Sequence, residues 1–259
     1  MQDSPIAAAL SVSRFTRLEA RRTNFFWLGF AVALGCLLIA EFLASLAITD
    51  SSSYRVGFYA AFARLGLVFI VTLFIASNLV REFEHRQIDL IFSRPLSRTW
   101  WFLGKLAGLW SSALVVTAIV ALPLFFFAPL GNVIAWAITL LAELAIVVAA
   151  TLTCVITFTN VPLALAAVAA FYLLSRSIES IALMSHGPTV DTSALSSQVI
   201  AELVSGLSYV LPGLNHFASV GLLDGPLELS SILILILEAL VYAALLAFAG
   251  LFDLHRRNL

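Results

Sequence analysis

Six long apolar segments dominate the pattern of hydrophobic and polar positions along the chain. They cover residues 25–48, 57–80, 105–127, 133–158, 162–183 and 230–252. A helix that crosses about 30 Å of hydrocarbon needs about 20 apolar residues, and every segment meets that length. Unpaired backbone groups are costly in hydrocarbon, so such runs form helices. The pattern therefore predicts an all-α polytopic membrane protein with six transmembrane helices.

The composition agrees with a surface that faces lipid. Apolar residues make up 61% and charged residues 11% of the 259 positions, against about 45–50% and about 25% in soluble domains. This argues against a soluble enzyme, a secreted disulfide scaffold and a disordered regulator. The net charge of -1 gives no basic field for nucleic acid. Both cysteines, Cys36 and Cys154, lie in apolar runs and are expected to be buried hydrophobes.

Basic residues predict the orientation, because Lys and Arg near membrane segments concentrate on the cytoplasmic side. Eleven of the 14 lie in the N-terminal arm, in the segment after the second span, or in the C-terminal tail: Arg14, Arg17, Arg21, Arg22, Arg81, Arg86, Arg94, Arg98, Lys105, Arg256 and Arg257. The segments predicted on the opposite side, residues 49–56, 128–132 and 184–229, hold only Arg55. We expect both termini in the cytoplasm of a bacterium or archaeon, with the chain in the inner membrane.

One transmembrane domain, residues 1–259, is predicted. Its N-terminal arm, residues 1–24, forms an interfacial amphipathic helix, with Ala8, Val12, Phe15 and Leu18 on one side and Arg14, Arg17 and Arg21 on another. Its cations face headgroups or a protein partner, or simply anchor the chain. The outer segment, residues 184–229, carries short helices. Its apolar stretch 195–211 is too short to cross the membrane and acts either as a lid or as a seal. Residues 253–259 form a cytoplasmic tail.

The segment between spans two and three, REFEHRQIDLIFSRPLSRTWWFLGK (residues 81–105), mixes charged and apolar side chains. We expect a helix that continues past the membrane and exposes Arg81, Glu82, Glu84, His85, Arg86 and Asp89. Pro95 interrupts it, Ser97 caps the helix that re-enters the membrane, and Trp100 and Trp101 lie at headgroup level. This charged elbow either transmits motion or is an ordinary cytoplasmic turn.

Two glycines follow the elbow with GxxxG spacing. Gly104 and Gly108 lie on one face of the third predicted span. This spacing permits close approach of a neighbouring helix, although it also occurs by chance in apolar spans.

Six ionisable residues fall inside predicted spans: Glu41, Arg64, Glu143, Arg176, Glu179 and Glu238. Each needs a partner or water, because a charge in hydrocarbon costs at least about 2.5–3.5 kcal/mol. Similar depths predict that Glu41 pairs with Arg64, and that Arg176 pairs with Glu238 or Glu179. Glu143 has no evident cation. The six residues either line a translocation route or lock helices together.

Motifs of catalysis are missing from the chain. It contains no GxxxxGK[ST] phosphate loop, no HExxH pair and no GxSxG elbow. Its four histidines, His85, His186, His216 and His255, all lie outside the predicted spans. We therefore expect no catalytic residue, no metal site and no bound cofactor.

The elbow resembles the membrane subunits of ABC transporters of the type-2 exporter class. Their pattern has an acidic stretch, a leucine-containing helix, an sRPxSR turn and a Gly-Lys at the start of span three. It is matched here by Glu82, Glu84, Leu90, Ser93, Arg94, Pro95, Ser97, Arg98, Gly104 and Lys105. The match covers about 25 residues. Gln87 departs from the pattern, since many members of the class carry glycine there.

The resemblance implies a permease, which is not an enzyme by itself. Two such subunits, here expected to be identical, would pair within the lipid bilayer and bind two separate ABC ATPase subunits that carry ATP and magnesium. The elbow would be the coupling helix, with contacts to the ATPase from Glu82, Glu84, His85, Arg86, Asp89, Arg94, Pro95 and Arg98. Two alternatives stay open. One is an ion-coupled secondary carrier with Glu143 as its proton or cation site, and the other is a membrane scaffold or assembly factor that docks a cytoplasmic partner.

Overall fold

The computed structural model describes residues 5–46, 51–84, 97–185, 202, 204–208, 211–217, 223 and 229–256, and those residues form helices without a strand among them. The long helices are α1 (Pro5–Arg22), α2 (Phe25–Leu46), α3 (Ser51–Glu84), α5 (Arg98–Ala121), α6 (Leu130–Phe158), α7 (Val161–Ser185) and α11 (Leu229–Arg256). A 3-10 turn, η1 (Leu122–Phe126), follows α5, and the short α9 (Leu214–Phe217) precedes α11.

Six of these helices, α2, α3, α5 with η1, α6, α7 and α11, are long and apolar enough to cross a membrane. The predicted all-α architecture is therefore confirmed for the described residues, together with the presence of six helices long and apolar enough to span a membrane. The largest difference in length is at α3, where the apolar run 57–80 predicts a shorter element. Its 34 residues span about 51 Å, because the polar residues that flank the run continue the same helix.

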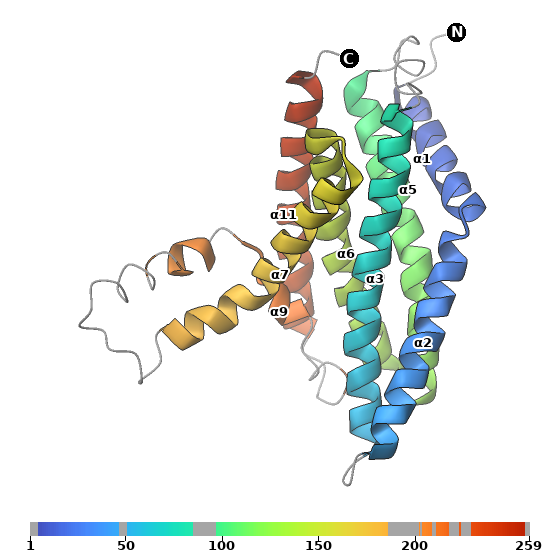
Figure 1. The fold of residues 1–259 in the computed structure, drawn as a ribbon, viewed down its shortest axis with the longest axis vertical. Coiled ribbons are helices and arrows are strands. Elements are labelled where there is room, and N and C mark those ends of the chain that lie inside the picture. Colours follow the sequence, from blue (N-terminus) through green and yellow to red (C-terminus); the bar gives the residue numbers. More distant parts are fainter. Residues whose placement is uncertain are drawn as a thin grey trace.

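The two ends of the described chain lie at the same end of the bundle (Figure 1). The last turn of α3 and the first turn of α5, which flank residues 85–96, lie there as well, whereas the end of α2 and the start of α3 are at the opposite end (Figure 1). The sequence predicts that the basic segments and Arg55 lie on opposite sides of the membrane. The positions of these helix ends are consistent with that prediction. The assignment of the basic end to the cytoplasm stays a prediction.

Helix α6 forms the centre of the bundle and packs against α3, α5, α7 and α11. In its most apolar stretch 72% of residues are buried, compared with 22% in α2 and α11. The two outer helices turn large apolar side chains such as Leu38, Phe42 and Phe248 outward. Such exposure suits a surface that faces lipid rather than water.

The helix boundaries follow from local backbone geometry. Thr159 ends α6 in the left-handed conformation with φ 51°, and Pro162 occupies the first turn of α7, where its missing N–H leaves no hydrogen bond unmade. Ser97 stands at the predicted N-cap position of α5 with an extended backbone, but its side chain makes no capping hydrogen bond. Trp101, expected at headgroup level, is 1% exposed and packs in the core.

Several predicted features lie outside the described residues. They include most of the charged elbow, with His85, Arg86, Asp89, Arg94 and Pro95, and most of the predicted outer segment with its apolar stretch.

Candidate functional site

A cluster of four ionisable or polar side chains joins three helices inside the bundle. Glu143 on α6 accepts a hydrogen bond from Arg64 Nη1 on α3 at 2.6 Å through Oε2. Its other oxygen, Oε1, accepts a hydrogen bond from the Tyr172 hydroxyl on α7 at 2.8 Å and lies 3.6 Å from Arg176 Nη1. Arg176 Nη1 in turn donates to the Tyr172 hydroxyl oxygen at 2.7 Å. Both oxygens of one carboxylate are therefore engaged by two arginines and a tyrosine.

Neighbouring side chains complete the cluster. Arg64 Nη2 donates to the Thr139 hydroxyl oxygen at 3.2 Å, and its guanidinium lies 5.5 Å from the centre of the Trp136 ring. The Thr139 hydroxyl in turn donates a hydrogen bond to the Trp136 carbonyl oxygen. On α6, Trp136, Thr139 and Glu143 are spaced at i, i+3 and i+7, so they form one stripe that faces α3. An arginine over an aromatic face gains further electrostatic stabilisation.

The cluster lies deep within the membrane-spanning part. Arg64 and Glu143 are 1% and 0% exposed. Each follows the first residue of its helix, Ser51 or Leu130, by about 20 Å at helical rise. Charges at this depth are retained only where they are paired and hydrogen-bonded. The geometry therefore locks α3, α6 and α7 together. Arg176, with 24% of its side chain exposed, carries the cluster to the surface of the chain.

The predicted pair of Glu41 with Arg64 is wrong, and so is the Glu238 alternative for Arg176, whereas its Glu179 alternative lies outside the described residues. Glu41 pairs with Arg55 at 3.0 Å, near the α2–α3 connection, instead of with Arg64. Arg176 lies against Glu143 instead of Glu238, whose Oε1 accepts a hydrogen bond from the backbone N–H of Gly213 at 3.1 Å. Depth counted along the sequence does not show which helices are neighbours or which way their faces point.

Glu143, predicted to lack a cation, is instead the anion that two arginines share. The sequence held one signal that Arg64 faces the inside of the bundle. Arg64 lies on the same face of α3 as the small and apolar residues Ala60, Leu67 and Val71, which are all buried. The side chain of Glu179 lies outside the described residues.

A second charged cluster lies at the end of the bundle that carries both termini. Lys105 on α5 forms ion pairs with Glu82 on α3 and, at 3.3 Å, with Glu19 on α1. Lys105 is 3% exposed and Glu82 is 6% exposed. The prediction that Glu82 is exposed for contact with a partner is therefore wrong, because α1 and α5 cover it.

Helix α1 can pack over Glu82 because two glycines of α5 allow α1 to approach α5 closely. A Cβ atom built at Gly104 would lie 2.6 Å from the Ala9 carbonyl oxygen, and one at Gly108 would lie 2.7 Å from Thr16 Cβ. The close approach that this GxxxG spacing permits does occur, and the approaching helix is the N-terminal arm. On α1 the small residues Ser13, Thr16 and Ala20 are buried, whereas the predicted apolar positions Phe15 and Leu18 are exposed.

The remaining predicted coupling residues that the structure describes flank residues 85–96 of the elbow. Arg98 Nη1 donates to the Leu254 carbonyl oxygen at 3.0 Å, which joins the start of α5 to the end of α11. Glu84 ends α3, and its side chain lies outside the described residues.

We expect Lys105→Met to lower the free energy of unfolding by about 2–3 kcal/mol, because it keeps the buried side-chain volume but leaves two carboxylates without a cation. Thermal unfolding of the purified protein in detergent measures the change. Adding Glu19→Gln and Glu82→Gln should restore part of the loss by removing the unpaired charges. A triple variant less stable than the single one would contradict this account of the cluster.

Within the described residues, no three His, Cys, Asp or Glu side chains come close enough to hold a metal ion. A scan of the chain against protein-family models finds no match, and a search among curated proteins finds no similar sequence.

Proposed function

We propose that the chain is the membrane-spanning permease subunit of an ATP-binding-cassette exporter. Two copies would pair in the membrane and bind two separate ATPase subunits, which carry ATP and magnesium. The elbow motif supports this proposal from the sequence. The observation that carries it is the Lys105 cluster, which joins α1 to both helices that enter and leave the elbow.

The contacts provide a route from the elbow to the bundle. A displacement of residues 85–96 would act on α3 and α5, which Lys105 and Glu82 hold together. Glu19 extends the connection to α1, and the Arg98 hydrogen bond extends it to α11. Buried ion pairs and close-packed glycines resist independent motion of these helices. The four helix ends would therefore move together when the ATPase subunits change state.

The intramembrane cluster would carry that motion into the far half of the bundle. Arg64 lies on the same helix as Glu82, 18 positions earlier, or about 27 Å along the axis. Through Glu143 it is bonded to α6, and through Arg176 and Tyr172 to α7. Coupling would be a population shift, in which closure of the ATPase subunits favours one of two packings of the spans.

The geometry is less favourable to an ion-coupled carrier with Glu143 as its site. Both carboxylate oxygens of Glu143 are already engaged by Arg64, Arg176 and Tyr172. A transported cation would have to displace an arginine, which would leave a buried charge without its partner. This arrangement suits a structural connection between helices better than an exchangeable site.

Isolation of the full-length protein from its native host in a mild detergent should recover an ABC ATPase with it. Charge reversal in the elbow, Arg86→Glu with Asp89→Lys, should remove most of that ATPase while membrane insertion is unchanged. Glu202→Lys is a control for charge reversal elsewhere in the chain, since Glu202 is exposed and follows α7 on the far side of the predicted membrane. Mass spectrometry and ATP hydrolysis of the purified material measure how much ATPase is recovered with each variant.

Preparations that consistently lack an ATPase, or elbow variants that retain it fully, would contradict the proposal. An ATPase complex that moves no substrate in sealed vesicles would instead favour the scaffold alternative.

A further inference from the structure

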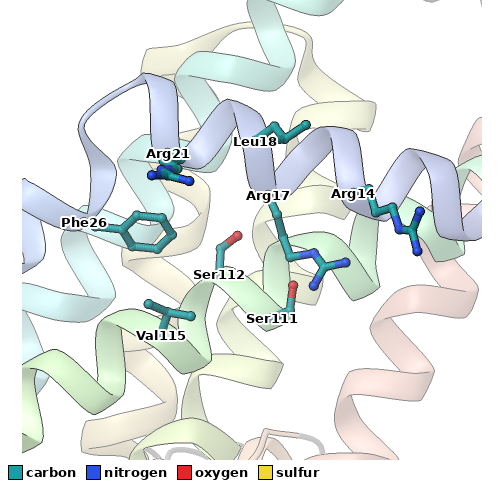
Figure 2. Close-up of a pocket in the computed structure, with 8 residues that line it drawn as sticks. All are labelled: Arg14, Arg17, Leu18, Arg21, Phe26, Ser111, Ser112 and Val115. Carbon is teal, nitrogen blue, oxygen red and sulfur yellow. The ribbon is translucent and has the colours of Figure 1, made fainter.

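A groove of about 390 Å³ opens between α1 and the second half of α5. Its lining comes from three helices: Arg14, Arg17, Leu18 and Arg21 on α1, Phe26 on α2, and Ser111, Ser112 and Val115 on α5. Figure 2 shows the side chains of Arg14 and Arg17 extending from α1 toward α5, with Ser111 below Arg17. Phe26 and Val115 lie together at the other end of the groove (Figure 2).

The charge of the groove is uncompensated within the described residues. Arg14, Arg17 and Arg21 follow one another at i, i+3 and i+7, so they line one stripe of α1. In the described part of the chain no carboxylate lies within ion-pair distance of any of them. The acidic residue of α1, Glu19, is engaged with Lys105. Three exposed arginines of α1 therefore line the groove, and none of them is paired with a carboxylate of the described residues.

The other part of the lining is apolar and belongs to membrane-spanning helices. Val115 lies about 15 Å along α5 from Lys105, and Phe26 is the second residue of α2. Ser111 and Ser112 donate their hydroxyl hydrogens to the Gly108 carbonyl, and a hydroxyl can rotate to redirect such a hydrogen. Elsewhere on α1, the apolar side chains of Leu10 and Phe15 are 50% and 58% exposed. The arginines of α1 thus adjoin apolar side chains of two membrane-spanning helices, as the boundary of a bilayer requires.

We propose that this groove binds one anionic phospholipid of the inner leaflet. Its phosphate would lie among Arg14, Arg17 and Arg21, where guanidinium groups can donate paired hydrogen bonds to phosphate oxygens. Its acyl chains would leave along Phe26 and Val115. A free phosphate ion would use the arginines but not the apolar end. Basic pockets between membrane helices on the cytoplasmic side suit lipid headgroups in this way.

The bound lipid would hold α1 against α5. It would contact α1 through the arginines and α5 through Ser111 and Val115, on the side of α1 away from Glu19. This inference does not depend on an ATPase partner, because the groove is formed within one chain.

The test is titration of delipidated full-length protein in neutral detergent with phosphatidylglycerol, phosphatidylcholine or inorganic phosphate. Native mass spectrometry counts bound lipid, and thermal unfolding reports stabilisation. We expect one tightly bound phosphatidylglycerol that raises the unfolding temperature. Arg14→Gln/Arg17→Gln/Arg21→Gln should weaken its binding on the order of 100-fold, since each arginine near an anionic headgroup strengthens binding by roughly fivefold.

The matched control removes three exposed arginines outside the groove, Arg22, Arg81 and Arg256, each by substitution with Gln. It has the same net charge and should bind phosphatidylglycerol like the wild type. A second variant, Val115→Trp, should fill the apolar end and weaken binding without changing any charge.

Several results would overturn the proposal. Equal binding of phosphatidylcholine would indicate nonspecific lipid, and equal stabilisation by inorganic phosphate would indicate a free-anion site. Loss of binding in the control to the same extent as in the groove variant would show that only total charge matters. Wild-type affinity in Val115→Trp would place the lipid elsewhere, whether or not the arginine variant folds.

Discussion

Glu143→Ala should destabilise the protein by about 3–5 kcal/mol, the usual cost of removing one partner of a buried ion pair. The substitution leaves Arg64, which is 1% exposed, without its carboxylate in the centre of the bundle. Arg176 and the Tyr172 hydroxyl also lose the acceptor that they share. We expect a large fall in the yield of folded protein and in the thermal unfolding temperature in detergent. Fluorescence-detected size-exclusion chromatography after heating measures both.

Glu41→Ala is the matched control, because it removes a carboxylate from a pair at the rim of the bundle. Glu41 and Arg55 have side chains that are 44% and 28% exposed, so the expected cost is only about 0–1 kcal/mol. Arg64→Met added to Glu143→Ala should recover part of the loss. Equal effects of the two single alanine variants, or no recovery in the double variant, would contradict a stabilising role for the cluster.

Gly104→Ala combined with Gly108→Ala should separate α1 from α5. The added Cβ atoms would meet backbone atoms, the Ala9 carbonyl oxygen at 2.6 Å and the Ser13 carbonyl oxygen at 3.0 Å, which a side-chain rotation cannot relieve. Overpacking of this kind costs about 1–3 kcal/mol at each site. We expect faster tryptic cleavage after Arg14 and Arg17 as α1 is displaced, together with a lower unfolding temperature.

Gly35→Ala controls for the loss of glycine itself. Gly35 lies on α2, and a Cβ atom there would have no neighbour within 4 Å. Alanine is intrinsically the better helix former by about 1 kcal/mol, so no loss of stability is expected. If the α5 glycine variants were as stable and as protease-resistant as Gly35→Ala, the close packing of α1 on α5 would be refuted.

The number and approximate position of the long apolar helices were predictable from the sequence, because each depends on local properties alone, although α3 is longer than its apolar run. A run of about 20 apolar residues is sufficient to predict a membrane-spanning helix, whatever its neighbours. The GxxxG spacing at Gly104 and Gly108 also indicated that close packing was possible there, and it occurs. It did not identify the approaching helix, since small residues permit an approach without specifying which helix makes it.

The charged contacts could not be predicted, because they depend on which helices are neighbours and how each is rotated about its axis. Depth along the membrane placed Arg64 level with Glu41, but the buried stripe of α3 turns Arg64 toward α6 and Glu143. Likewise, the charge of Glu82 predicts an exposed side chain, whereas α1 and α5 cover it in the structure. The sequence by itself determined six apolar helices and the grouping of positive charge, since hydrophobicity and helical rise are properties of each segment. Only the tertiary structure decided the pairing of Glu143, the burial of Glu82 and the arginine groove. Each of these brings together residues from helices that are distant in the sequence.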